Sequence, residues 1–111
     1  MAAPPDSPFG AVFGPGTHHR GDLSFEGRVR VDGTFRGRIY TDDTLEIGES
    51  GTVDGEIDAA FVVVAGVASG GIRARERLVL QPTGTLRGKV DAKALEAHPG
   101  GKVDATVRIG G

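Results

Sequence analysis

Residues 51–57 read GTVDGEI and residues 84–90 read GTLRGKV, two copies of one pattern in which small residues alternate with aliphatic ones. The centre of the pattern, a small residue followed by a spacer and an aliphatic residue, recurs along the chain at intervals of 15 to 18 residues. Its six copies begin at Gly21, Gly37, Gly55, Gly70, Gly88 and Ala105. A repeat of this length is typical of solenoid folds, in which each unit stacks on the previous one.

Each repeat carries a second apolar pair, five or six residues after the aliphatic residue. These pairs are Val29/Val31, Leu45/Ile47, Val62/Val64, Leu78/Leu80 and Leu95/Ala97. The period of two within each piece indicates short strands with one buried face. Three such strands in about 17 residues predict one triangular coil of a parallel β-helix. We therefore predict an all-β, single-domain fold of about five to six stacked coils.

Two segments depart from the repeat. Residues 1–20 contain four prolines and three glycines, so we expect a disordered N-terminal tail followed by a β-helix domain over residues 21–111. Residues 91–98, followed by Pro99, have the composition of a short helix. Ala97, Gly101 and Val103 nevertheless keep the spacing of the other repeats, which favours a strand there.

Stacking in register predicts which side chains face inward and which outward. The expected interior consists of Val29, Val31, Phe35, Ile39, Leu45, Ile47, Val53, Ile57, Val62, Val64, Ile72, Leu78, Leu80, Leu86, Val90, Leu95, Val103 and Val107. One outward column should hold Asp58, Arg73, Asp91 and Arg108, about 4.8 Å apart and alternating in sign. Unlike charges at that spacing stabilise by about 0.2 to 1 kcal/mol each, so the order supports the register.

Two groups of apolar residues fall outside the predicted interior. Phe61, Val63 and Val79 take outward positions, either as scattered surface residues or as a lateral or partner contact. Phe9, Val12 and Phe13 are the bulky apolar residues of the tail, which is either an inert leader or a weak anchor to a membrane surface or a partner.

Composition argues against most kinds of chemistry. The chain has no Cys, and its net charge of -2 comes from mixed charges without a basic patch, so neither a thiolate site nor nucleic-acid binding is expected. His18, His19 and His98 form no rigid metal triad. The glycine-rich residues 65–71 lack the Lys-[Ser/Thr] of a phosphate loop. We predict no catalytic residue, cofactor or metal, and no apolar run of about 20 residues that would span a membrane; the expected location is the cytoplasm.

The coils at residues 31–39 (VDGTFRGRI), 45–48 (LEIG), 51–57 and 84–90 resemble those of the bactofilin family. The resemblance covers about residues 21 to 109. It implies a right-handed β-helix with disordered ends that assembles into nonpolar filaments without nucleotide. It further implies roles in bacterial cell shape and in localising cell-wall enzymes or polar factors. Members often carry an N-terminal membrane motif, which implies membrane association, and an aromatic residue in the C-terminal end contact, where this chain has Val107 and Ile109.

The ends of such a helix predict its partner. Each end exposes unpaired backbone groups and an apolar mouth, and the repeat shows no capping helix at either end. Stacking on another copy would cover both, so we place the polymerisation interface at the terminal coils. Its expected residues are Leu23, Val29 and Val31 at one end and Val103, Val107 and Ile109 at the other.

Two other readings remain open. A left-handed hexapeptide-repeat acyltransferase would form trimers, and residues 47–53 (IGESGTV) fit one hexad of that pattern. Its strict six-residue steps fail at Ser69 and Arg75. A monomeric adaptor is the third reading.

Overall fold

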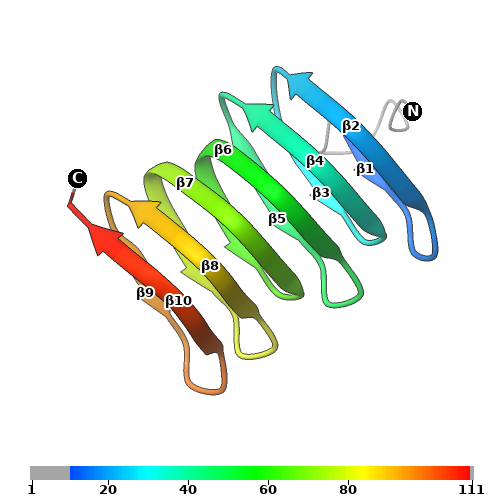
Figure 1. Cartoon of the computed structure of the whole chain (residues 1–111). Helices are drawn as coiled ribbons and strands as arrows, with labels where there is room; N and C mark the ends of the chain where they lie inside the picture. Colours follow the sequence, from blue (N-terminus) through cyan, green and yellow to red (C-terminus); the bar gives the residue numbers. More distant parts are fainter. Residues whose placement is uncertain (1–10, 111) are drawn as a thin grey trace.

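The computed structural model describes residues 11–110, and over that part of the chain it consists of strands and turns without a helix. The strands form a parallel β-solenoid, in which the chain winds from one end of the stack to the other (Figure 1). They are β1 (Ala11–Phe13), β2 (His18–Phe25), β3 (Val29–Val31), β4 (Thr34–Thr41), β5 (Thr44–Ile47), β6 (Thr52–Val64), β7 (Val67–Leu80), β8 (Thr85–Ala92), β9 (Leu95–Ala97) and β10 (Lys102–Ile109). The predicted fold class is confirmed, and the 91–98 segment contains a strand, β9, as its spacing predicts.

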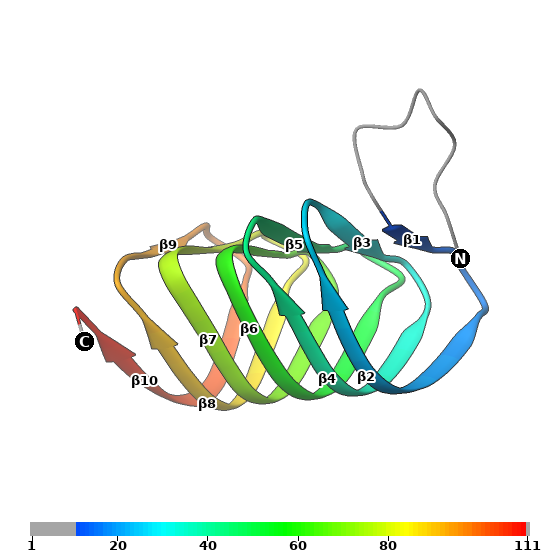
Figure 2. The same ribbon diagram turned by 90° about the horizontal axis from the view of Figure 1, so that it is seen from above.

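The strands pair in two ladders that run the length of the stack. One follows the order β1-β3-β5-β6-β7-β9 and the other β2-β4-β6-β7-β8-β10, and every pairing is parallel. The long strands β6 and β7 contribute to both ladders, because each runs through a corner of its coil. The strands β1 and β2 lie at one end of the stack, and β9 and β10 lie at the other (Figure 2).

Glycines form the corner between the strand segments. Gly21, Gly37, Gly55, Gly70 and Gly88 pair in register with one another, and their φ angles lie between +98° and +140°. Residues with a Cβ rarely adopt such angles. A Cβ at Gly55 would also lie 1.9 Å from the carbonyl oxygen of Gly37 in the coil below. At Gly55 the corner therefore requires glycine for both conformation and space, whereas Ala105 takes the equivalent position in the last coil without a positive φ.

The predicted interior is confirmed for all coils except the last. Of the eighteen side chains predicted to face inward, those from Val29 to Val90 are at most 4% exposed. Small side chains at Ala59, Ala68, Ala74 and Ala92 complete this core. Leu95 and Val107 are partly buried, and Val103 is 44% exposed, because no described residue covers the coil to which they belong.

The folded part begins earlier than the sequence predicts, which corrects the boundary between residues 20 and 21. Strand β1 and the first residues of β2 lie inside the expected tail, and β1 pairs with β3. Phe13 is 7% exposed and packs edge-on against Phe35, with 5.6 Å between ring centroids. It is a core residue, not part of an anchor. Prolines and glycines around this short strand obscure its period, and residues 1–10, including Phe9, lie outside the described residues.

One arginine connects three successive coils on the outer face. The register between β6 and β7 shifts between Ala59 and Phe61, where β7 carries an extra residue. At this bulge, Arg75 donates a hydrogen bond from Nη2 to the Thr41 carbonyl oxygen at 2.7 Å and places Nε 3.3 Å from Asp58 Oδ1. Its guanidinium also lies 5.3 Å from the centre of the Tyr40 ring. We expect this side chain to hold the irregular coil in place.

Replacing Arg75 by methionine should lower the free energy of unfolding by about 1.5 to 3 kcal/mol, because hydrogen bonds to a charged group contribute about that much. A thermal melt followed by circular dichroism should show a fall in Tm of several degrees. The matched control is Arg77→Met on the same strand, since the Arg77 side chain forms no ion pair or hydrogen bond with the described residues. Equal losses in the two variants would contradict this role.

Candidate functional site

The terminal coils expose strand edges. Among the described residues, β9 pairs only with β7 and β10 only with β8, while at the other end β1 pairs only with β3 and β2 only with β4. Each terminal strand therefore presents a row of backbone N–H and C=O groups without a strand partner. Such edges favour pairing with a further strand.

The C-terminal coil also exposes an apolar mouth. Val103 and Ile109 are 44% and 48% exposed, whereas Leu86 and Ala92, their register partners one coil below, are 0% and 1% exposed. Val107 is partly buried above Val90. The same positions are thus interior in the middle of the stack and open at its end. The structure places the predicted residues Val103, Val107 and Ile109 together on this coil.

The N-terminal end differs from the prediction. Val29 and Val31 are fully buried, because β1 covers β3, so these two residues do not line an open mouth. The coil above them contributes Phe13 and the partly buried Leu23 and Phe25 instead. Of the three residues predicted for this end, Leu23 alone lies on the terminal coil. The signal for Phe13 is present in the sequence, where it is one of the bulky apolar residues of the expected tail.

His19 is a further feature of the N-terminal coil, and the sequence pattern assigns it no place in the fold. It pairs in register with the core residue Phe35, and its ring lies 4.4 Å from that of Phe13 in an edge contact. Its Nε2 atom is buried without a hydrogen-bond partner among the described residues. A polar ring atom thus sits next to the apolar end of the stack.

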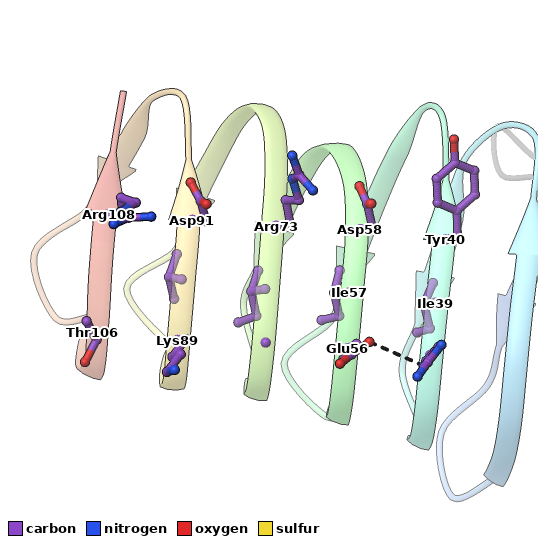
Figure 3. A pocket seen from close by; sticks show the side chains of 14 residues that line it. Ile39, Tyr40, Glu56, Ile57, Asp58, Arg73, Lys89, Asp91, Thr106 and Arg108 are labelled. Atoms are coloured by element: carbon purple, nitrogen blue, oxygen red, sulfur yellow. Dashed lines mark ion pairs between the residues drawn. The ribbon is translucent and has the colours of Figure 1, made fainter. Parts of the chain in front are cut away.

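One outer face of the solenoid carries rows of charged side chains along a groove of about 700 Å³ (Figure 3). The groove crosses β4, β6, β7, β8 and β10. One row contains Tyr40, Asp58, Arg73, Asp91 and Arg108, each in register with the next. The other row contains Arg38, Glu56, Gly71, Lys89 and Thr106. The column predicted from Asp58 to Arg108 is therefore confirmed, but the groove between the two rows was not predicted.

The outward apolar residues lie along a different ladder. Val63 pairs in register with Val79, and the column continues to Glu46 on one side and Glu96 on the other. Phe61 is 44% exposed and pairs with Arg77. Acidic and basic neighbours surround these side chains, which form a small patch of three residues. Its role as a lateral or partner contact stays a prediction.

The described residues contain no group of three or more His, Cys, Asp or Glu side chains that could hold a metal ion, and no helix long enough and apolar enough to cross a membrane. The most connected ionic group is Arg30, which lies 2.8 Å from Asp32 and 2.7 Å from Glu46. The hydrogen bond to the Asp32 carboxylate raises the pKa of Arg30 above its usual value. These ion pairs connect neighbouring coils, and stabilising the stack is sufficient to explain them.

Comparisons with known proteins agree with the geometry. A model of the Bactofilin family, described as polymer-forming cytoskeletal, matches residues 11–108. The chain is 33% identical to the bactofilin of Thermus thermophilus in its double helical filaments, over 88% of this chain and 99% of the other, with a TM-score of 0.80. A crystal structure of a point mutant of the Thermus thermophilus bactofilin is 36% identical over 79% and 98% of the two chains, with a TM-score of 0.75. No curated protein matches the chain.

Proposed function

Since this chain belongs to the bactofilin family of polymer-forming cytoskeletal proteins, we propose that it polymerises end to end through its terminal coils, without nucleotide and without catalysing a reaction. The observation that carries the proposal is the exposure of Val103 and Ile109 above the buried Leu86 and Ala92. A second copy stacked on β9 and β10 would bury these side chains as the next coil would. It would also pair the open strand edges.

At the other end we propose an interface that differs in composition from the one predicted. The partly buried Leu23 and Phe25 offer aliphatic and aromatic surface there. Aromatic side chains contribute more buried area than valines, so this end can supply a strong contact. Contacts between like ends give a nonpolar filament, and contacts between unlike ends give a polar one. The family resemblance favours contacts between like ends.

Nucleotide independence is supported by the role of the glycines in residues 65–71. Gly70 belongs to the corner ladder, and a Cβ at Gly66 would lie 2.2 Å from the Gly51 carbonyl oxygen. These glycines therefore serve the packing of one coil on the next. They do not form a loop before a helix, where phosphates bind.

The cellular role rests on the family. We propose a cytoplasmic filament that supports cell shape or localises cell-wall enzymes or polar factors. The Thermus thermophilus relative forms double helical filaments, and we extend two-stranded assembly to this chain. Association with a membrane surface through Phe9 and Val12 stays a prediction. Phe13 no longer belongs to it, because its side chain is in the core.

The test is assembly of the purified full chain. Ultracentrifugation and negative-stain electron microscopy should show long filaments, and the pelleted fraction should be the same with no nucleotide, with ATP or with GTP and Mg²⁺. Compact trimers, or monomers at all concentrations, would contradict end-to-end polymerisation. Nucleotide-dependent pelleting would contradict the proposed mechanism while preserving the filament.

A further inference from the structure

The charged column consists of Asp58, Arg73, Asp91 and Arg108, which project from β6, β7, β8 and β10 on one outer face (Figure 3). Successive members are register partners, so they lie about 4.8 Å apart along the solenoid axis. Their charges read minus, plus, minus, plus. The column is therefore a linear charge pattern with a defined direction.

Most of this column has no ionic partner among the described residues. Asp58 lies 3.3 Å from Arg75, but Arg73, Asp91 and Arg108 form no ion pair within 4.0 Å with any described residue. Arg73 and Arg108 are exposed and Asp91 is half-buried. Their in-register neighbours stabilise them only weakly. These three side chains are thus available to groups from another molecule.

The charge order of the column is complementary to the same order read in the opposite direction. A two-fold axis that runs parallel to the strands and passes between the levels of Arg73 and Asp91 brings a second copy face to face and antiparallel. Asp58 then faces Arg108 of the second copy, and Arg73 faces its Asp91. The axis repeats both contacts, which gives four unlike pairs in a closed, isologous interface. A parallel copy in the same register would instead place like charges opposite each other throughout.

The second row of the groove fits the same arrangement. Lys89 of the second copy faces Gly71, where a Cβ would meet only the Glu56 side chain, at 3.8 Å. The missing side chain leaves room for the lysine, and Glu56 lies beside that space. Glu56 itself faces Thr106 of the second copy, so the row contains no like-charge contact across the axis. The groove of about 700 Å³ is the space that these side chains would fill.

We propose that this face is a lateral interface at which two copies of the chain pair side by side and antiparallel through the charged column. The interface lies on the side of the solenoid, away from the mouths at its two ends. It rests on the two-stranded assembly proposed above, for which it names the contact surface, and it does not require end-to-end contacts. In a filament, it would join two strands side by side, with each subunit antiparallel to the subunit that it faces.

Charge reversals separate this proposal from its alternatives. Arg73→Asp and Asp91→Arg each place two like pairs across the axis, so each variant alone should lose two-stranded filaments, and the wild type should separate into single strands near 1 M salt. Mixing the two variants restores all four unlike pairs. The double variant Arg73→Asp with Asp91→Arg also restores them, although it places like charges next to each other within its own column. Only pairing with an antiparallel copy explains recovery in the double variant.

The measurement is the number of strands per filament, from filament width and mass per length in electron microscopy, with circular dichroism to confirm folding. Arg87→Asp is the matched control, because Arg87 lies on β8 on the other side of the Gly88 corner. It should keep two strands, and the fraction of two-stranded filaments should fall at least tenfold in each single variant. Two strands in every variant would overturn the proposal and assign the groove to another partner. Single strands in the double variant would overturn the antiparallel geometry.

The lateral interface can also be tested if end-to-end assembly fails. In that case sedimentation velocity on the wild type should show dimers that Arg73→Asp converts to monomers and the double variant restores. Monomeric wild type would overturn the lateral interface. Failure of the filament and failure of the lateral pair are therefore distinguishable.

Discussion

Replacing Ile109 by arginine is expected to abolish filament formation while the coils stay folded. Ile109 is 48% exposed at the end of β10, so an arginine there remains solvated in the free protein. In an end-to-end contact the same side chain would lose the burial of apolar surface, which is worth about 25 cal/mol per Å². It would also place an unpaired cation in the interface, at a cost of several kcal/mol. The critical concentration should rise at least about a hundredfold, since 1.4 kcal/mol corresponds to a factor of ten.

Sedimentation and circular dichroism on the same samples test this expectation. The matched control is Val63→Arg, which introduces the same charge on an outward, half-buried position of β6, away from both ends. It should keep single filaments intact. Val107→Arg should also block assembly, but Val107 is partly buried against the core, so its stability must be measured as well. If Ile109→Arg still pellets and Val63→Arg does not, assembly is lateral and the end contact is wrong.

Replacing Gly55 by alanine is expected to prevent folding or to cause a large loss in the free energy of unfolding. The residue has φ +140°, and its new Cβ would lie 1.9 Å from the Gly37 carbonyl oxygen. The strained backbone alone costs about 1 to 3 kcal/mol. The clash adds to this, because the opposing atom belongs to a strand held by pairing on both sides. The total should exceed about 4 kcal/mol, a large part of the stability of a domain this size.

Gly21→Ala separates the two causes. Gly21 occupies the same ladder position with φ +126°, but no atom lies within 4 Å of a Cβ built there. This variant should therefore show only the strain, and its midpoint of denaturation should fall by half as much or less than that of Gly55→Ala. Gly71→Ala, without positive φ and with its nearest atom at 3.8 Å, should be close to neutral for stability. Equal effects at Gly21 and Gly55 would show that the close approach of the coils is not limiting.

The terminal coils are the part of the fold that the sequence pattern predicts least completely. The pattern assigns Phe13 to a tail, because three residues of strand are too few to show a period. It places Val29 and Val31 at an open mouth for the same reason, since the coil that covers them carries no recognisable repeat. The spacing of Val103 and Val107 places them in register with the core residues Leu86 and Val90, but no described coil covers them, so Val103 is exposed and Val107 is only partly buried.

The repeat in the chain specifies the coil length, the strand register, the interior from Val29 to Val90 and the order of charges in the charged column. A parallel stack turns equal spacing along the chain into contact in space, so the period alone specifies these neighbours. Features that do not repeat follow from the three-dimensional packing and cannot be derived from the period. Arg75 reaches Thr41 across 34 residues through one bulge, and the gap at Gly71 becomes a groove only when its neighbours surround it. Such contacts depend on side-chain reach and on where the stack ends, and neither leaves a period in the sequence.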